Sequence, residues 1–82
     1  MSDLSKDDIT RIQQEASLKL GQRIREIREQ KGLTQTELAH RIQSDRQYLY
    51  KIEFAKIGVS FGKTAVIAKA LGVSVSELAE KV

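Results

Sequence analysis

The segment QTELAHRIQSDRQYLYKIEF, residues 35–54, decides the fold of this chain. It predicts two short amphipathic helices joined by a tight turn. Thr34 is placed to start the first helix, because its hydroxyl can accept a hydrogen bond from the backbone N–H of Glu37 while the Glu37 carboxylate reaches back. The apolar residues of this helix then fall on one face: Leu38, Ala39 and Ile42.

The second half of the segment predicts a helix with a polar and basic outer face. Asp45 is a good N-cap residue, and Leu49 and Ile52 lie three residues apart on the inner face. Four side chains are left to point outward: Arg46, Gln47, Tyr50 and Lys51. The pair of helices therefore suits a helix-turn-helix, residues 35–54, that lays its second helix in the major groove of DNA.

An apolar stripe precedes this motif. Its members recur at spacings of 3, 4, 4, 4 and 3, which is typical of one helix face: Ile9, Ile12, Ala16, Leu20, Ile24 and Ile27. The stripe predicts a helix from about Ser5 to Gln30 that Gly32 ends. Either one helix runs through Gly21 or two helices meet near Ser17, and we favour the single helix.

Two further helices are expected after the motif. Ser60 can cap a helix over residues 61–71, and Gly72 stands where a helix end favours a left-handed residue. Ser74 and Glu77 form a capping box for a last helix from Val75 to about Lys81. The inward residues expected for the fourth helix are Phe61, Ala65, Ile67, Ala68 and Leu71.

Composition favours one small all-helical domain. The chain has 82 residues, no proline and no cysteine, which excludes disulfides and thiolate metal sites. No apolar run approaches the roughly 20 residues that span a bilayer, and the first ten residues lack the apolar stretch of a signal peptide. We expect a cytoplasmic protein without a membrane segment.

Charge is unevenly distributed along the chain. The net charge is +3, but residues 16–69 hold eleven basic and five acidic side chains, whereas residues 1–15 hold two basic and four acidic ones. A basic middle region between mildly acidic ends fits an electrostatic footprint for phosphate.

Three separated motifs carry a resemblance to a known family. LTQTELAHRI from Leu33, DRQYLYKIE from Asp45 and AKALGVSVSEL from Ala68 occur in the order found in the Cro/C1-type helix-turn-helix (XRE) family, which includes the lambdoid phage repressors. The resemblance covers about residues 20–82. It implies an all-α, five-helix lambda-repressor-like domain over residues 18–82, with residues 1–17 as an N-terminal helical extension, and a homodimer on operator DNA.

The chain departs from the family pattern in the turns. The family usually has glycine at Gln43, where the backbone tends to be left-handed, and a side chain there costs roughly 1 kcal/mol. It also tends to have glycine at Ala55 and proline near Val59, so we expect Gly58 to supply the flexible backbone of that loop.

The first turn of the second motif helix is where side chains reach base edges. Arg46 can donate two hydrogen bonds to guanine, and Gln47 can bind adenine through two. Lys51, one turn later, can reach a base or a phosphate. The family resemblance gives the same positions a role in reading bases.

Other DNA contacts are expected around this helix. Tyr50 can pack on a thymine methyl or donate to a phosphate, while Tyr48 either does the same or packs on the helix flank as a partly buried aromatic residue. Gln35, in the first turn of the earlier helix, is a phosphate contact in the family and lies where a helix dipole attracts anions. Lys56 and Lys63 are weaker phosphate candidates.

The resemblance also implies a structural role for Arg28 and Glu53. In phage repressors the matching residues form a partly buried ion pair that ties the first helix to the recognition helix. His40 has no second histidine or cysteine with which to share a metal. No nucleophile–base set or phosphate loop is present, so we expect no enzyme activity, no cofactor and no metal.

These observations predict a sequence-specific DNA-binding transcriptional regulator, with repression favoured, that binds a near-palindromic operator as a dimer. Two alternatives use the same fold. An antitoxin would bind a toxin partner through its N- and C-terminal segments, and the acidic residues 1–15 are the feature that supports this alternative. A restriction–modification control protein would fit the size of the chain.

Overall fold

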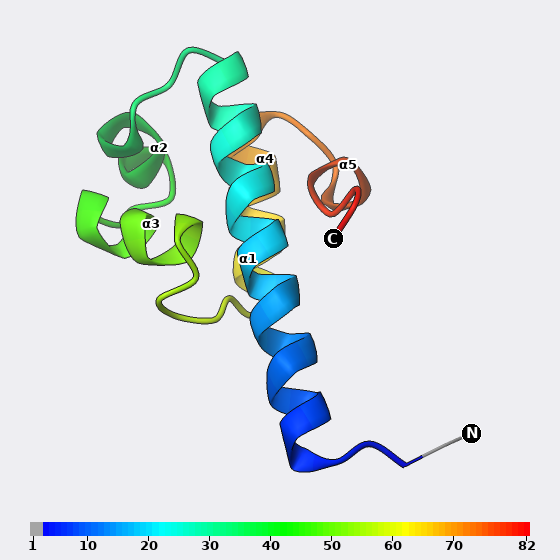
Figure 1. Cartoon of the computed structure of the whole chain (residues 1–82). Coiled ribbons are helices and arrows are strands. Elements are labelled where there is room, and N and C mark those ends of the chain that lie inside the picture. Colours follow the sequence, from blue (N-terminus) through cyan, green and yellow to red (C-terminus); the bar gives the residue numbers. More distant parts are fainter. Residues whose placement is uncertain (1–2) are drawn as a thin grey trace.

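The computed structural model describes residues 3–82 and builds them into an all-helical fold. It contains α1 (Lys6–Gln30), α2 (Gln35–Arg41), α3 (Arg46–Glu53), α4 (Phe61–Leu71) and α5 (Val75–Leu78). The helix-turn-helix, α2 and α3, lies on one side of α1, and α5 lies on the other (Figure 1). The predicted fold class is therefore confirmed.

The first helix is continuous, as favoured from the sequence. It starts at a capping box in which the hydroxyl of Ser5 accepts from the backbone N–H of Asp8, and it runs through Gly21 to the C-cap Lys31. A 25-residue helix spans about 37 Å, and the longest dimension of the molecule is 42 Å. The length of the described residues is therefore set by α1, in which residues 6–17 continue without a break into the rest of the helix.

The core is assembled from one face of each helix. α1 supplies Ile24 and Ile27, and the central residues of the other helices are fully buried against them: Leu38, Leu49, Ile52, Ile67 and Leu78. The motif residues Ala39 and Ile42 are buried as expected. Two arginines bind carbonyl oxygens near helix ends: Arg23 donates to that of Glu77 and Arg41 to that of Ala70.

The turns explain two of the departures from the family. Gln43, in the turn of the helix-turn-helix, has φ 55°, and Ala55, after α3, has φ 56°. Both are left-handed, so side chains stand where the backbone favours glycine, at about 1–2 kcal/mol each. The expectation for Gly58 was wrong, since Gly58 is not left-handed and Ala55 itself makes the turn.

Two expectations for the C-terminal half were also wrong. α5 ends at Leu78 instead of continuing to Lys81, because the chain tightens into turns after Ala79 and Lys81 is left-handed at φ 71°. Phe61 is 77% exposed, although the periodicity placed it inward. It occupies the first position of α4, beyond the edge of the core, where Ile57 and Val59 of the preceding loop pack instead.

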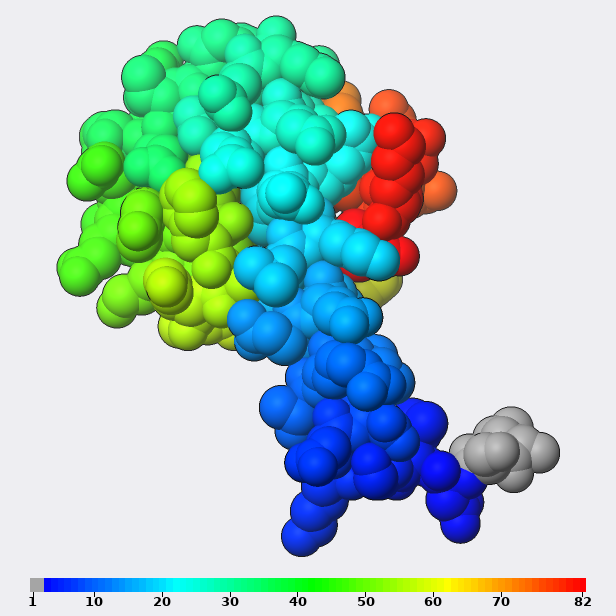
Figure 2. Space-filling model, in the orientation of Figure 1, coloured from blue at the N-terminus to red at the C-terminus, as the bar shows by residue number. Residues whose placement is uncertain are grey.

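The N-terminal half of α1 extends away from the rest of the molecule (Figures 1 and 2). Ile9 and Ile12 remain 44% and 46% exposed. Ile9 and Ile12, at the N-terminal end of the apolar stripe, therefore do not pack on the chain's own core, whereas Ile24 and Ile27 at its other end do. None of the helices within residues 3–82 combines the length and the hydrophobicity that a transmembrane span needs.

Acid should destabilise the protein through its helix caps. The carboxylates of Glu37 and Glu77 accept hydrogen bonds from the backbone N–H of Thr34 and Ser74, and these bonds hold the pKa of both carboxyls below the ordinary value of 4.5. A lowered folded-state pKa gives stability that is present above the unfolded pKa and is lost as the pH falls through the folded value.

Replacing both residues by glutamine should flatten this acid limb, because glutamine keeps the capping hydrogen bond without titrating. We expect the melting temperature of the double variant to fall less than that of the parent between about pH 6 and pH 3. Thermal melts across this range provide the measurement. An equal fall in both proteins would show that the caps do not contribute to the acid limb.

Candidate nucleic-acid interface

The helix α3 presents a polar face because its other face is fully used in packing. Leu49 and Ile52 are 0% and 1% exposed. The helix starts at Asp45, whose Oδ1 accepts from the backbone N–H of Tyr48 at 2.8 Å. The four outward residues expected from the sequence are all exposed: Arg46, Gln47, Tyr50 and Lys51. The structure therefore brings the candidate base-reading side chains together on one exposed helix face.

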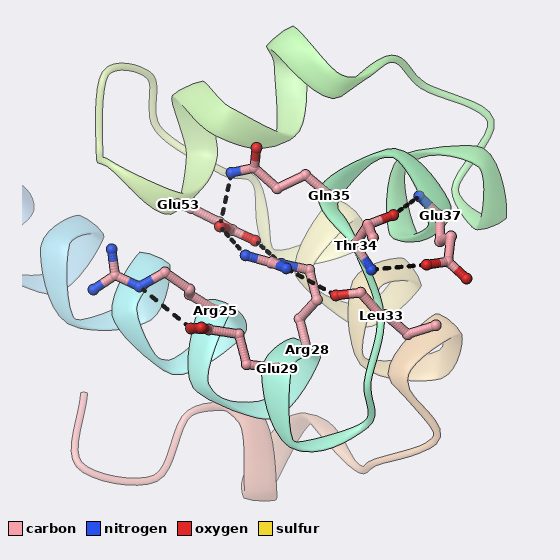
Figure 3. A network of polar contacts seen from close by, with 8 residues as sticks. All are labelled: Arg25, Arg28, Glu29, Leu33, Thr34, Gln35, Glu37 and Glu53. Carbon is pink, nitrogen blue, oxygen red and sulfur yellow. Dashed lines mark hydrogen bonds and ion pairs between the residues drawn. The ribbon is translucent and has the colours of Figure 1, made fainter.

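A buried ion pair fixes α3 against α1 (Figure 3). Arg28 Nε donates to Glu53 Oε2 at 2.7 Å, and Arg28 Nη2 donates to Glu53 Oε1 at 3.1 Å. The third donor, Nη1, binds the carbonyl oxygen of Leu33 at 2.8 Å. Hydrogen bonding to the carboxylate raises the pKa of Arg28 above its ordinary value. Glu53 thus lies inward, where it does not repel a phosphate at the outer face of α3.

Gln35 joins this network from the first turn of α2. Its Nε2 donates to Glu53 Oε1 at 3.1 Å, and the residue is half-buried (Figure 3). A side-chain amide carries two N–H donors, so one can hold Glu53 while the other binds a phosphate. The sequence assigned Gln35 to phosphate alone and missed its second role as a link between α2 and α3.

The two tyrosines differ in their surroundings. Tyr48 is half-buried, and Lys63 Nζ of α4 lies 5.5 Å from the centre of its ring. This matches the flank-packing alternative for Tyr48. Tyr50 is 43% exposed and its ring centre lies 4.8 Å from that of Phe54. Lys56 is exposed in the loop after α3.

Sequence reasoning missed the contribution of Phe54 and Arg25. The guanidinium carbon of Arg25 lies 5.0 Å from the centre of the Phe54 ring, which stacks in turn against Tyr50. The four-residue spacing between Tyr50 and Phe54 was the available signal, since such residues are neighbours on a helix. This cluster extends the exposed face of α3 onto α1.

The described residues offer little for other kinds of site. Among residues 3–82, no group of three or more histidine, cysteine, aspartate or glutamate side chains is arranged to hold a metal ion. His40 lies exposed on α2. All buried side-chain polar atoms within residues 3–82 have hydrogen-bond partners, so no buried group is left waiting for a ligand there.

Comparisons with known proteins agree with this geometry. The chain is similar to an immunity repressor protein of Bacillus phage phi105, with 39% identity over 59 residues. The match covers 72% of this chain but 41% of that repressor, so the chain spans about two-fifths of the length of this curated relative.

Two solved structures are also similar. The restriction-modification controller protein C.AhdI of Aeromonas hydrophila has a TM-score of 0.71 at 39% identity, over 74% of this chain and 92% of that one. The clp gene regulator ClgR of C. glutamicum has a TM-score of 0.75 at 33% identity, over 77% and 82%. A helix-turn-helix family model matches residues 24–78. This chain therefore belongs to the Cro/C1-type (XRE) helix-turn-helix family.

Proposed function

We propose that this protein is a sequence-specific DNA-binding transcriptional regulator that acts in the cytoplasm. The observation that carries the proposal is the exposed face of α3, where Arg46, Gln47 and Lys51 stand together on a helix whose opposite face is locked into the core. Guanidinium and amide groups in this position recognise guanine and adenine edges in the major groove. Similarity to a phage repressor supports repression as the form of regulation.

The contacts divide into those that read bases and those that position the protein. Arg46, Gln47, Tyr50 and Lys51 face the groove. Phosphates are bound around its edges by the free amide N–H of Gln35 and by Lys56, while Tyr48 packs on the flank of the helix. The Arg28–Glu53 pair has no DNA contact of its own, and it holds α3 at a fixed angle to α1.

The protein acts as a homodimer on double-stranded DNA. Each copy inserts α3 into one major groove, and the two half-sites of a near-palindromic operator lie about 34 Å apart or a multiple of that distance. Occupancy of promoter DNA then blocks or recruits polymerase. Selection of bound duplexes from a random pool identifies the operator, and inverted half-sites are the expected result.

Binding should fall steeply with salt, because eleven basic side chains lie within residues 16–69. If a dimer neutralises about five or six phosphates, the slope of log affinity against log salt should be near −5. Fluorescence anisotropy of the selected duplex over a salt series provides the measurement. A slope near zero, or no binding at low salt, would contradict the proposal.

A second candidate is the control of a restriction–modification system. It is favoured by the similarity to C.AhdI, since the match covers 92% of that controller protein. The two candidates share the DNA-binding mechanism and differ in target. A selected operator that recurs upstream of neighbouring restriction and methyltransferase genes would support this second role, and one found elsewhere would favour general regulation. The antitoxin alternative stays a hypothesis that a neighbouring toxin gene would support.

A further inference from the structure

The exposed apolar residues of the N-terminal half of α1 need a partner. Ile9 and Ile12 are nearly half exposed, and Ala16, one turn further on, is exposed as well. Leu4 and Ile9 occupy the positions of a hydrophobic staple around the Ser5 cap, which accounts for Ile9 in part. Ala16 also lines a shallow hollow with Gly58 and Val59 of the loop after α3, whereas no local role accounts for Ile12.

Charged residues border this stripe in a regular order. Asp8, Arg11, Glu15 and Lys19 each precede a member of the apolar stripe by one position, so they form a parallel row on the same helix. Their signs alternate along the row, from negative at Asp8 to positive at Lys19. Arg11 contacts both acidic neighbours, at 3.2 Å from Asp8 Oδ1 and 4.0 Å from Glu15 Oε1. Lys19 has no ion pair within residues 3–82.

This row is complementary to itself when reversed. Two copies of the helix that run antiparallel, with a twofold axis between residues 13 and 14, bring Asp8 opposite Lys19 of the second copy and place Arg11 within one residue of Glu15. In a parallel twofold pair the two rows would instead lie on opposite sides of the seam and would not meet. In a twofold contact, residue i of one copy meets residue j of the other, and residue j of the first meets residue i of the second. The order of charges in this row satisfies that requirement when the second copy runs in the opposite direction.

We propose that the N-terminal half of α1 is the dimer interface, and that it pairs antiparallel with the same segment of a second copy. Ile9, Ile12 and Ala16 form the apolar seam, and the small side chain of Ala16 lets the helices approach closely. The apolar seam supplies the affinity, because exposed ion pairs contribute little. The charged row sets the direction of pairing. The inference rests on the proposed function, in which two copies share one operator.

The proposed axis also sets the separation of the two points at which α3 contacts α1. α3 contacts α1 at Gly21, which lies about 11 Å along the helix from the proposed axis at 1.5 Å per residue. With 8–10 Å between the paired helices, the two Gly21 residues stand about 24 Å apart. The roughly 34 Å between successive turns of one DNA groove exceeds this separation by about 10 Å, and the offset of each α3 from its own α1, about 8–10 Å, must supply the difference.

Matched substitutions test the seam. Ile12→Lys adds one positive charge within the stripe, and Leu18→Lys adds the same charge at an equally exposed residue outside it, since both side chains are 46% exposed. Circular dichroism should show both variants folded. In sedimentation from about 1 µM to 1 mM, the parent and Leu18→Lys should self-associate and Ile12→Lys should stay monomeric. Equal behaviour of the two variants would overturn the proposal.

Charge exchange tests the direction of pairing. Arg11→Glu makes both central positions of the row acidic, and Glu15→Arg makes both basic, so each variant alone should associate on the order of tenfold more weakly than the parent. Mixing the two should restore association, and the double variant Arg11→Glu/Glu15→Arg should associate like the parent. A mixture no stronger than its components would overturn the pairing.

The DNA-binding proposal and this one fail separately. A chain that dimerises through the stripe but binds no duplex would leave the interface intact and refute the proposed function. If the Ile12→Lys and Leu18→Lys variants bind the operator equally well, the proposed interface is refuted and the proposed function is left intact.

Discussion

Gly21→Ala should destabilise this protein strongly, although glycine to alanine within a helix normally stabilises by up to about 1 kcal/mol. A Cβ atom at Gly21 would overlap the carbonyl oxygen of Glu53 and lie 2.7 Å from that of Ile52. Both are backbone atoms of α3, so no side chain can rotate away, and α3 must move as a unit. We expect a loss of about 3 kcal/mol or more, from a total of about 4–12 kcal/mol for a chain of this size.

Gly62→Ala is the matched control. Gly62 lies in the first turn of α4, and a Cβ atom there has nothing within 4 Å. This variant should be unchanged or stabilised by up to about 1 kcal/mol. Urea denaturation of both variants gives the comparison. If Gly21→Ala is as stable as Gly62→Ala, the close approach of α1 and α3 at Gly21 is wrong.

Arg28→Met should have the second largest effect. The Glu53 side chain is 0% exposed and loses two of its three hydrogen bonds in this variant. A buried carboxylate without its partner costs about 3–5 kcal/mol. The double variant Arg28→Met/Glu53→Leu removes both charges and should recover most of that stability, because two apolar side chains of similar size can fill the space.

Arg25→Met gives the control for charge and helix propensity. Arg25 lies on the same helix, is one-third exposed, and its Nε is 4.0 Å from Glu29 Oε1, so its loss should change stability by less than about 1 kcal/mol. Unfolding free energies of the parent and the three variants form the comparison. A double variant as unstable as Arg28→Met would show that the cost does not come from the unpaired carboxylate.

Much of the fold could be predicted because its signals are local. Thr34 with Glu37, Asp45 and Ser74 with Glu77 each start a helix where the structure has one. The failures occurred where local signals end. Phe61 follows the helical period but stands beyond the edge of the core, and α5 stops early because Lys81 turns left-handed. Neither property is encoded in periodicity.

The candidate site divides in the same way. The outward set on α3 followed from helix periodicity, because the buried Leu49 and Ile52 leave only one other face. The second role of Gln35, its bond to Glu53, depends on contact between residues eighteen positions apart and could not be read from spacing. The stacking of Arg25 on Phe54 is likewise a tertiary contact. Which of these residues touch DNA stays a prediction.

Binding of Gln47→Ala and Gln35→Ala to the operator and to each of its single-base variants tests the central claim, that α3 reads bases while α2 binds the backbone. Gln47→Ala should lose about 1–3 kcal/mol at one cognate base pair and little on unrelated DNA. Gln35→Ala should weaken binding to every sequence alike, because phosphate contacts position and base contacts specify. If Gln47→Ala weakens all variants equally and Gln35→Ala changes the base preference, the placement of the recognition helix is contradicted.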